Sequence, residues 1–103
     1  MESTKVVFTG HVHGEVQLFA DEEQIGKMSL AMTGGRLAVF HTEVDPEFEG
    51  RGFAKLLLAE LVGYAREKDL KIIPLCPYVN AQFHRHPAEY EDVWSKDWHG
   101  MQG

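Results

Sequence analysis

Residues 36–68, RLAVFHTEVDPEFEGRGFAKLLLAELVGYAREK, predict a strand, a glycine loop and a helix in direct succession. The segment Arg36–Val44 is rich in Val, Phe and Thr, which strands favour, and follows a Gly-Gly turn. Asp45-Pro46 ends this strand, because proline has no N–H to donate to a sheet and restricts the residue before it. In residues 55–68 apolar side chains recur every three to four positions, which indicates an amphipathic helix.

The glycine loop, Glu49-Gly-Arg-Gly-Phe-Ala54, leads directly into the first turn of that helix. The first amides of a helix have no partner within it and lie at the positive end of its dipole. Glycines at positions 50 and 52 allow an anion to approach this backbone closely. The loop therefore predicts a phosphate site. It is neither a P-loop, which needs Gly-Lys-Ser/Thr, nor a dinucleotide fingerprint, because Lys55 occupies the third glycine position.

The segments on either side predict the rest of one α/β domain. Upstream strands are expected at 5–8, 15–20 and 25–33, and Gly34-Gly35 closes a hairpin into the central strand. Downstream, a strand at 71–76 should return parallel to the central one by the right-handed crossover rule. We expect a second helix at 79–86 ended by Pro87, frayed residues at 1–4, sheet-covering aromatics within 90–98 and a loose tail at 99–103.

The length and the net charge of the chain limit the range of possible functions. With 103 residues the chain predicts one domain, 1–103, with a single modest core. A net charge of −6 argues against nucleic acid as a partner and favours a cationic one, such as an amine substrate, unless it is only a solubilising surface. One cysteine excludes an internal disulfide and agrees with a reducing compartment. Without a membrane-length apolar run or a signal-peptide pattern, we expect no membrane association and a cytoplasmic location.

A metal site is not expected. His11 and His13 could face one side of a strand, but no third ligand lies near them in the sequence.

Four ordered blocks carry a family resemblance: His41-Thr-Glu-Val44, Gly50-Arg-Gly52, Leu75-Cys-Pro-Tyr-Val79, and Arg85-His-Pro87 followed by Tyr90. Together they resemble the small YjdJ-type single-domain acetyltransferases of the GNAT superfamily, over about residues 15–94. The glycine loop is similar to the pyrophosphate loop of that superfamily, Arg/Gln-x-x-Gly-x-Gly/Ala. Glu49 departs from this pattern, because it stands where the family has Arg or Gln.

The resemblance implies a minimal GNAT-like α/β fold: an antiparallel meander, then a parallel strand that splays away, and two helices. It implies acetyl-coenzyme A as cofactor, held in the V-shaped opening where the Arg36–Val44 and 71–76 strands splay apart. It also implies transfer of the acetyl group to a small-molecule or peptide amine. The chain is too short for the superfamily's extra helices and final strand pair, which enclose the binding site of the amine substrate. The residues implied to bind the cofactor are Thr42, Val44, Gly50, Arg51, Gly52, Phe53, Ala54 and Lys55.

Three residues are candidates for the chemistry. Glu43 and His41 lie two positions apart on one strand, so they share a face and either could accept the amine proton; alternatively they form a structural pair that bonds across the sheet. Cys76, at the end of the other splayed strand, could relay the acetyl group as a thiolate, or it is simply a small buried side chain.

The superfamily's usual acid, a tyrosine, is absent from the expected part of the second helix, where His84 and Arg85 stand. A non-catalytic acyl-coenzyme A binding module therefore remains the rival function. The third candidate function is that of a structural domain that binds a partner, in which the glycine loop resembles a phosphate site only by chance.

Overall fold

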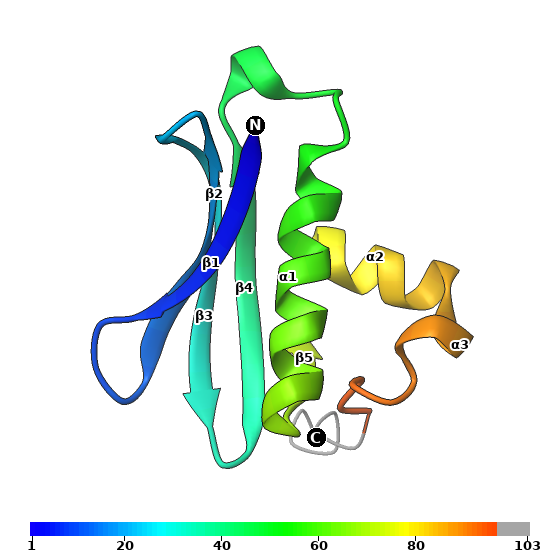
Figure 1. Ribbon diagram of the computed structural model, residues 1–103. Coiled ribbons are helices and arrows are strands. Elements are labelled where there is room, and N and C mark those ends of the chain that lie inside the picture. The colour runs from blue at the N-terminus through cyan, green and yellow to red at the C-terminus, as the bar shows by residue number, and fades with distance from the viewer. Residues whose placement is uncertain (97–103) are drawn as a thin grey trace.

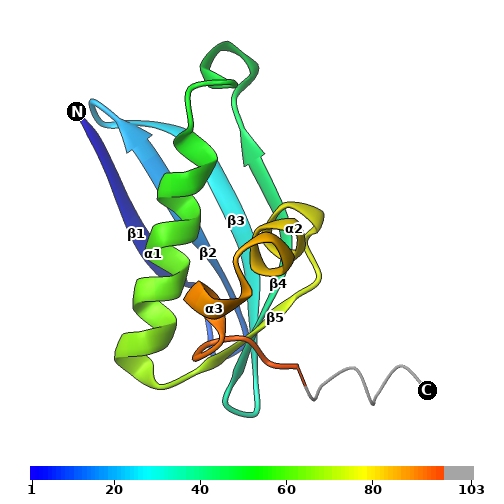
Figure 2. The same ribbon diagram turned by 90° about the vertical axis from the view of Figure 1, so that its right-hand side faces the viewer.

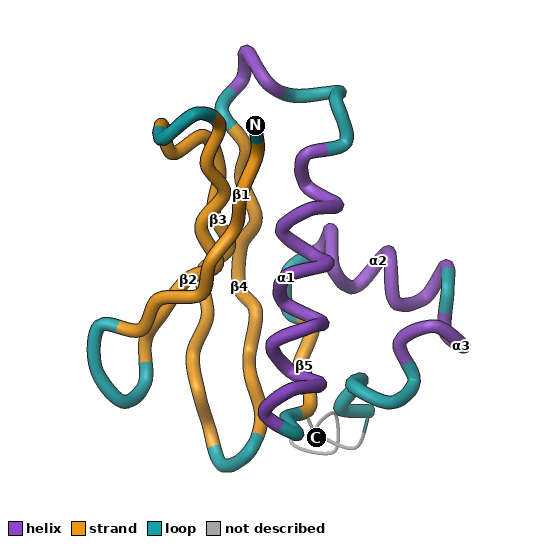
Figure 3. Tube along the Cα trace, in the orientation of Figure 1, coloured by secondary structure: helices purple, strands orange, loops and turns teal. Residues whose placement is uncertain are grey.

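A computed structural model describes residues 1–96 as a five-stranded sheet with helices packed on one face (Figures 1 and 2). The strands lie side by side in chain order, and α1 runs along the sheet, as the tube view in Figure 3 also shows. The elements are β1 (Glu2–Phe8), β2 (His13–Ala20), β3 (Glu23–Thr33), β4 (Arg36–Val44), the 3₁₀ turn η1 (Pro46–Phe48), α1 (Phe53–Lys68), β5 (Lys71–Pro74), α2 (Pro77–Arg85) and α3 (Pro87–Tyr90).

Strands β1 to β4 form the expected antiparallel meander. The β3–β4 hairpin turns at Gly34 and Gly35, whose φ angles of 54° and 80° suit glycine. A bulge interrupts this pair, because Ser29 lies opposite His41 while Leu30 lies opposite Val39. Phe40 is therefore an extra residue in β4, and the strand bends there.

Strand β5 pairs in parallel with only the first four residues of β4, Arg36 to Val39. On its other side the segment after α3 adds an isolated bridge, in which Ile72 N–H donates to Val93 O at 2.6 Å. Pro74 comes at the end of β5, where its missing N–H interrupts no further ladder bond.

The core lies between the sheet and the helices. α1 buries its apolar stripe, including Leu57 and Leu61, against fully buried strand residues such as Leu18. α2 closes the β5 side through Val79 and Phe83, and the Phe83 ring stacks on Tyr90 with centroids 4.8 Å apart.

The structure confirms the α/β class, the meander, the parallel last strand and the bounds of the central strand. Two expectations at the proline positions are wrong. The last strand ends at Pro74 rather than at 76, and Pro87 begins a third helix, because proline fits the first position of a helix as well as it ends one. Pro77 opens the second helix as expected, two residues before the expected bound of 79.

The N-terminus also differs from the expectation of a frayed end. Met1 O accepts the N–H of Asp21 at 3.1 Å, and the Met1 amino group lies 2.6 Å from the Asp21 carboxylate. Residues 2–4 therefore belong to β1. Trp98 and the tail at 99–103 lie outside the described residues. Within residues 1–96 no helix combines the length and apolar character that a membrane span requires.

Candidate active site

The second half of β4 has an edge that no described strand covers. β5 accompanies β4 only to Val39, whose carbonyl accepts the Cys76 N–H at 2.7 Å. On the opposite edge, the Asp45 N–H donates to Ile25 O of β3 at 2.7 Å. Because successive residues of a strand turn their backbone groups to alternate edges, those of Thr42 and Val44 face the uncovered side.

A cavity of about 540 Å³ opens against this edge. It is bounded by β4, by the loop into α1 and by the start of α2. The residues that line it are His41, Thr42, Glu43, Val44, Phe48, Glu49, Gly50, Gly52, Phe53, Ala54, Lys55 and Tyr78. The fold therefore brings together every predicted site residue except Arg51 and Cys76.

The glycine loop has the backbone that a phosphate site needs. Gly50 and Gly52 have φ angles of 82° and 79°, which L-residues with side chains rarely adopt. A Cβ at either position would meet nothing within 4 Å, so crowding by other parts of the fold does not require glycine there. Gly52 precedes α1 without a side-chain cap, which leaves the first-turn amides of Phe53 and Ala54 available to a ligand.

Charged side chains of both signs surround this loop. Lys55 and Glu49 both line the cavity, so the position that departs from the family pattern contributes a carboxylate beside the first turn of α1. Arg51 does not line the cavity; its guanidinium carbon lies 5.5 Å from the centroid of the Phe48 ring, in a cation–π contact. A role for Arg51 in cofactor binding stays a prediction.

His41 and Glu43 form an ordered pair at the rim of the cavity. His41 Nε2 lies 3.1 Å from Glu43 Oε1, and the two side chains are 62% and 54% exposed. The bond joins two residues of one strand, rather than crossing the sheet as the structural alternative supposed. The carboxylate orients the imidazole while solvent and cavity remain accessible to it, which suits a proton acceptor.

Cys76 lies behind the cavity rather than on its surface. It is 2% exposed, and its Sγ lies 3.1 Å from Oγ1 of Thr42, which does line the cavity. This burial supports a packing role, since a reactive thiol is partly exposed and ionised. The acyl-relay role stays a prediction.

Sequence reasoning singled out neither Phe48 nor Tyr78 among the lining residues, and of these two Tyr78 carries a polar group. Its hydroxyl oxygen is buried and has no hydrogen-bond partner. Burial is the main cause that raises the pKa of Tyr78 above 10.0, with smaller contributions from Tyr90 and Cys76, so the proton is held firmly near neutral pH. The signal in the sequence was its place in the Cys-Pro-Tyr start of α2, shortly after Pro74, where β5 ends.

The two N-terminal histidines are not part of this site. His13 begins β2 and His11 lies in the preceding loop, and residues 1–96 contain no cluster of three His, Cys, Asp or Glu that could hold a metal.

Comparisons with known proteins agree with this geometry. The sequence pattern of the family described as GCN5-related N-acetyl-transferase matches residues 15–93. No curated protein matches the chain significantly.

Solved acetyltransferase structures share the fold. The ribosomal-protein-alanine N-acetyltransferase from Brucella melitensis superposes with a TM-score of 0.67 at 13% identity, over 82% of this chain and 90% of that one. The ribosomal-protein-S18-alanine N-acetyltransferase from Escherichia coli gives a TM-score of 0.64 at 13% identity, over 70% of this chain and 64% of that one. At such identity the likeness concerns the fold, whereas the sequence match covers most of the chain. The protein belongs to the GCN5-related N-acetyltransferase family.

Proposed function

We propose that the protein binds acetyl-coenzyme A in the 540 Å³ cavity and transfers the acetyl group to a primary amine. One observation carries this proposal. The uncovered edge of β4 and the uncapped first turn of α1 border the same cavity, so backbone groups suited to an amide-bearing arm and to a pyrophosphate lie in sequence along it.

The residues present fit such a ligand. The amides of residues 50–54 would hold the pyrophosphate, with Lys55 adding charge, and the backbone of Thr42 and Val44 would hold the arm. When bound, acetyl-coenzyme A supplies an acetyl group activated as a thioester.

The side chains of the cavity provide for the two proton movements of acyl transfer. His41 Nε2 donates to the Glu43 carboxylate, which leaves Nδ1 as the nitrogen that accepts the proton from the incoming amine. The Tyr78 hydroxyl, protonated and without another partner, donates toward the thiol side of the cavity. The raised pKa of Tyr78 keeps its hydroxyl protonated, as a proton donor must be, which supports direct attack by the amine without a relay through Cys76.

The amine acceptor is inferred from charge. Glu43 and Glu49 both line the cavity, and the whole chain carries a net charge of −6. A protonated amine is attracted to such a surface before it loses its proton to the base.

Calorimetry and mass spectrometry test this function together. Coenzyme A should bind the purified protein, and a lysine-containing peptide should gain acetyl when acetyl-coenzyme A is present. Intact-mass analysis of the protein after the reaction should show an unmodified Cys76. An acetylated Cys76 that passes its label to the peptide would restore the relay mechanism.

The second candidate is a non-catalytic binding module. The last turn of α2 favours it, because His84 and Arg85 stand there in place of the tyrosine that is the superfamily's usual acid. Tight binding of coenzyme A without transfer to any of a set of amines would support it. Absence of coenzyme A binding would exclude both candidates.

A further inference from the structure

The outer edge of β1 is unpaired within residues 1–96. In Figure 2 this strand forms the margin of the sheet beside α1, and it pairs only with β2. The Asp21 N–H donates to Met1 O at 3.1 Å, so Met1 and every second residue after it turn their backbone toward β2. The backbone N–H and C=O groups of Glu2, Thr4 and Val6 therefore point away from the sheet, where another strand can pair with them.

Nothing along β1 protects this edge. Edge strands are commonly kept from further pairing by proline, by a bulge or by a charged side chain at the edge. β1 is seven residues long, contains no proline and pairs with β2 in unbroken register. Its one lysine, Lys5, lies over the Phe19 ring of β2, with Nζ 5.2 Å from the ring centroid, and so leans away from the free edge.

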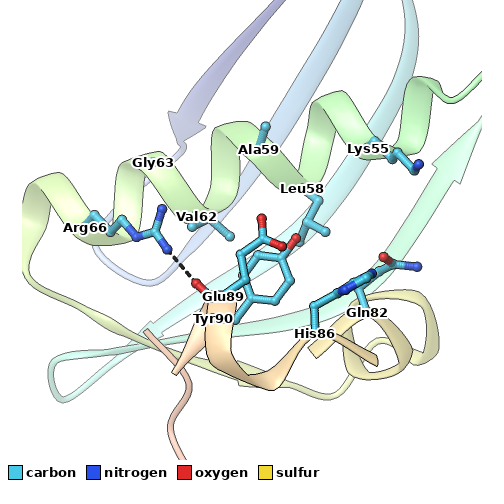
Figure 4. A pocket seen from close by; sticks show the side chains of 10 residues that line it. All are labelled: Lys55, Leu58, Ala59, Val62, Gly63, Arg66, Gln82, His86, Glu89 and Tyr90. Carbon is cyan, nitrogen blue, oxygen red and sulfur yellow. Dashed lines mark hydrogen bonds between the residues drawn. The ribbon is translucent and has the colours of Figure 1, made fainter. Parts of the chain in front are cut away.

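A groove of about 240 Å³ lies beside the same edge, between β1 and α1. Leu56 on α1 borders it and remains 38% exposed, although its side chain is large and apolar. The other flank of α1 differs, because α2 and α3 lie against it and Arg66 donates to the Glu89 carbonyl at 2.8 Å (Figure 4). The residues that line the groove are Glu2, Ser3, Thr4, Leu56, Ala59 and Glu60.

The charged groups of this groove are both carboxylates. Thr4 Oγ1 donates to Glu60 Oε1 at 2.7 Å, which holds the Glu60 carboxylate toward β1. Neither Glu60 nor Glu2 forms a salt bridge within residues 1–96. A side chain that enters the groove is therefore favoured by a positive charge.

A second copy of the chain fits this edge poorly. If two β1 strands joined into one antiparallel sheet, directly opposed residues would share a face of that sheet. Glu2 would then lie opposite another residue of the α1 face, such as Thr4 or Val6, and not opposite Lys5, which is on the other face. The carboxylates of the two grooves would come together on one face and repel each other.

We propose that the free edge of β1 binds an extended segment of a partner protein as a sixth strand, with a lysine or arginine side chain in the groove. The basic residue pairs with Thr4, because a residue opposite Thr4 shares its face and points toward Glu60. Residues two positions away on the partner lie on the same face, toward Leu56 and Val6, so apolar side chains suit them. This surface is on the opposite side of the sheet from the cavity at β4, so its occupation does not depend on acetyl transfer.

Synthetic peptides test the proposal with the whole protein. The probe is the heptapeptide Thr-Val-Thr-Lys-Thr-Val-Thr, blocked at both ends, in which the lysine and both valines share one face of a strand. Calorimetry at low salt should show it bound about fivefold more tightly than the same peptide with glutamate in place of lysine, and added salt should reduce this ratio.

Backbone methylation tests the mode of binding. N-methylation of the lysine should abolish binding, because the N–H of the residue opposite Thr4 faces β1. N-methylation of the threonine next to it should leave the affinity within about twofold, since that N–H turns to solvent.

Glu60→Gln tests the charge of the groove and keeps an oxygen that can accept the Thr4 hydroxyl. It should weaken binding of the lysine peptide about threefold and reduce the preference for lysine over glutamate. Glu67→Gln is the matched control, because Glu67 is exposed on α1, carries the same charge and does not line the groove. Its affinity for the lysine peptide should stay close to that of the wild type.

Several results would overturn the proposal. Equal affinity for the lysine and glutamate peptides would remove the basic residue, and equal losses from the two N-methylations would mean that the peptide does not add as a strand. If neither peptide binds while sedimentation shows a dimer that Glu60→Gln strengthens, a second copy occupies the edge instead. If neither binds to a monomeric protein, the edge takes no strand of this kind.

Discussion

At the scale of single residues, Tyr78 has the most unusual environment in the site. A buried hydroxyl without a partner costs roughly 1–3 kcal/mol of folding free energy, so the fold would be more stable without it. Such a cost is expected where a side chain serves a ligand instead of the fold. Sequence patterns cannot show this, because the isolation of the hydroxyl depends on how α2 packs against β4 and α1.

Tyr78→Phe should therefore move stability and activity in opposite directions. Removal of the orphaned hydroxyl should leave the free energy of unfolding unchanged or raise it by about 1 kcal/mol. Acetyl transfer should fall by at least about tenfold, since one proton donor is lost. Chemical denaturation and steady-state kinetics measure the two effects, and a variant with wild-type turnover would remove Tyr78 from the mechanism.

The same variant should alter the response to alkali. Because burial raises the folded-state pKa of Tyr78 above 10.0, the unfolded state loses this proton first, and stability falls as the pH rises past 10. Phenylalanine cannot ionise, so the loss of stability above pH 10 should be smaller in Tyr78→Phe. Parallel denaturation curves of the two proteins at pH 8 and at pH values above 10 would check the sign.

Glu49 is the residue at which this chain departs from the family pattern, and its location in the cavity makes the departure testable. Glu49→Gln removes one negative charge beside the predicted pyrophosphate site and should tighten coenzyme A binding about two- to threefold at low salt, less so as screening increases. Glu47→Gln is the matched control, because Glu47 is exposed on η1 and does not line the cavity. Equal effects of the two substitutions would mean that only net charge matters.

At the scale of elements, the junction from β4 through the glycine loop to α1 is the part that the sequence predicts best. The bounds Arg36–Val44 are correct because β-branched and aromatic residues, the Gly-Gly turn and Asp45-Pro46 all act locally. Pairing of residues 2–4 with β2 depends on partners at positions 18–20, far along the chain, so no local pattern revealed it. The prolines at 74 and 87 were ambiguous, because proline both ends strands and starts helices.

Gly52→Val tests the loop as an element. Valine at a φ of 79° is strained, and its side chain would occupy the space in front of the first-turn amides. Loss of charge-assisted bonds of about 1.5–3 kcal/mol each should weaken coenzyme A binding at least tenfold. Gly34→Val provides the matched control, since Gly34 also has positive φ but lies in the β3–β4 turn; it should lose stability and keep its affinity. Unchanged affinity in a folded Gly52→Val protein would separate the loop from cofactor binding.

At the scale of the whole molecule, the cavity at the start of α1 and the net charge of −6 impose different demands on ligands. The cavity offers Lys55 and first-turn amides to an anionic cofactor, whereas the molecule as a whole attracts cations. Both can hold at once, because close contacts at a helix N-terminus act over a few ångströms, while the overall field acts over the Debye length.

The overall field therefore predicts a preference among acceptors. With acetyl-coenzyme A held at saturation, a lysine peptide of net charge about +3 should be acetylated with a higher kcat/KM than one of charge about −3 and otherwise matched sequence, because an acidic protein steers cations toward it. Raising the ionic strength from 0.01 M to 0.1 M shortens the Debye length from about 30 Å to about 10 Å, so the advantage should shrink. The preference should lie in kcat/KM rather than in kcat, since it concerns encounter and not the chemical step. If both peptides react equally at both ionic strengths, the net charge serves solubility alone, and acceptor choice must come from contacts at the rim around His41 and Glu43.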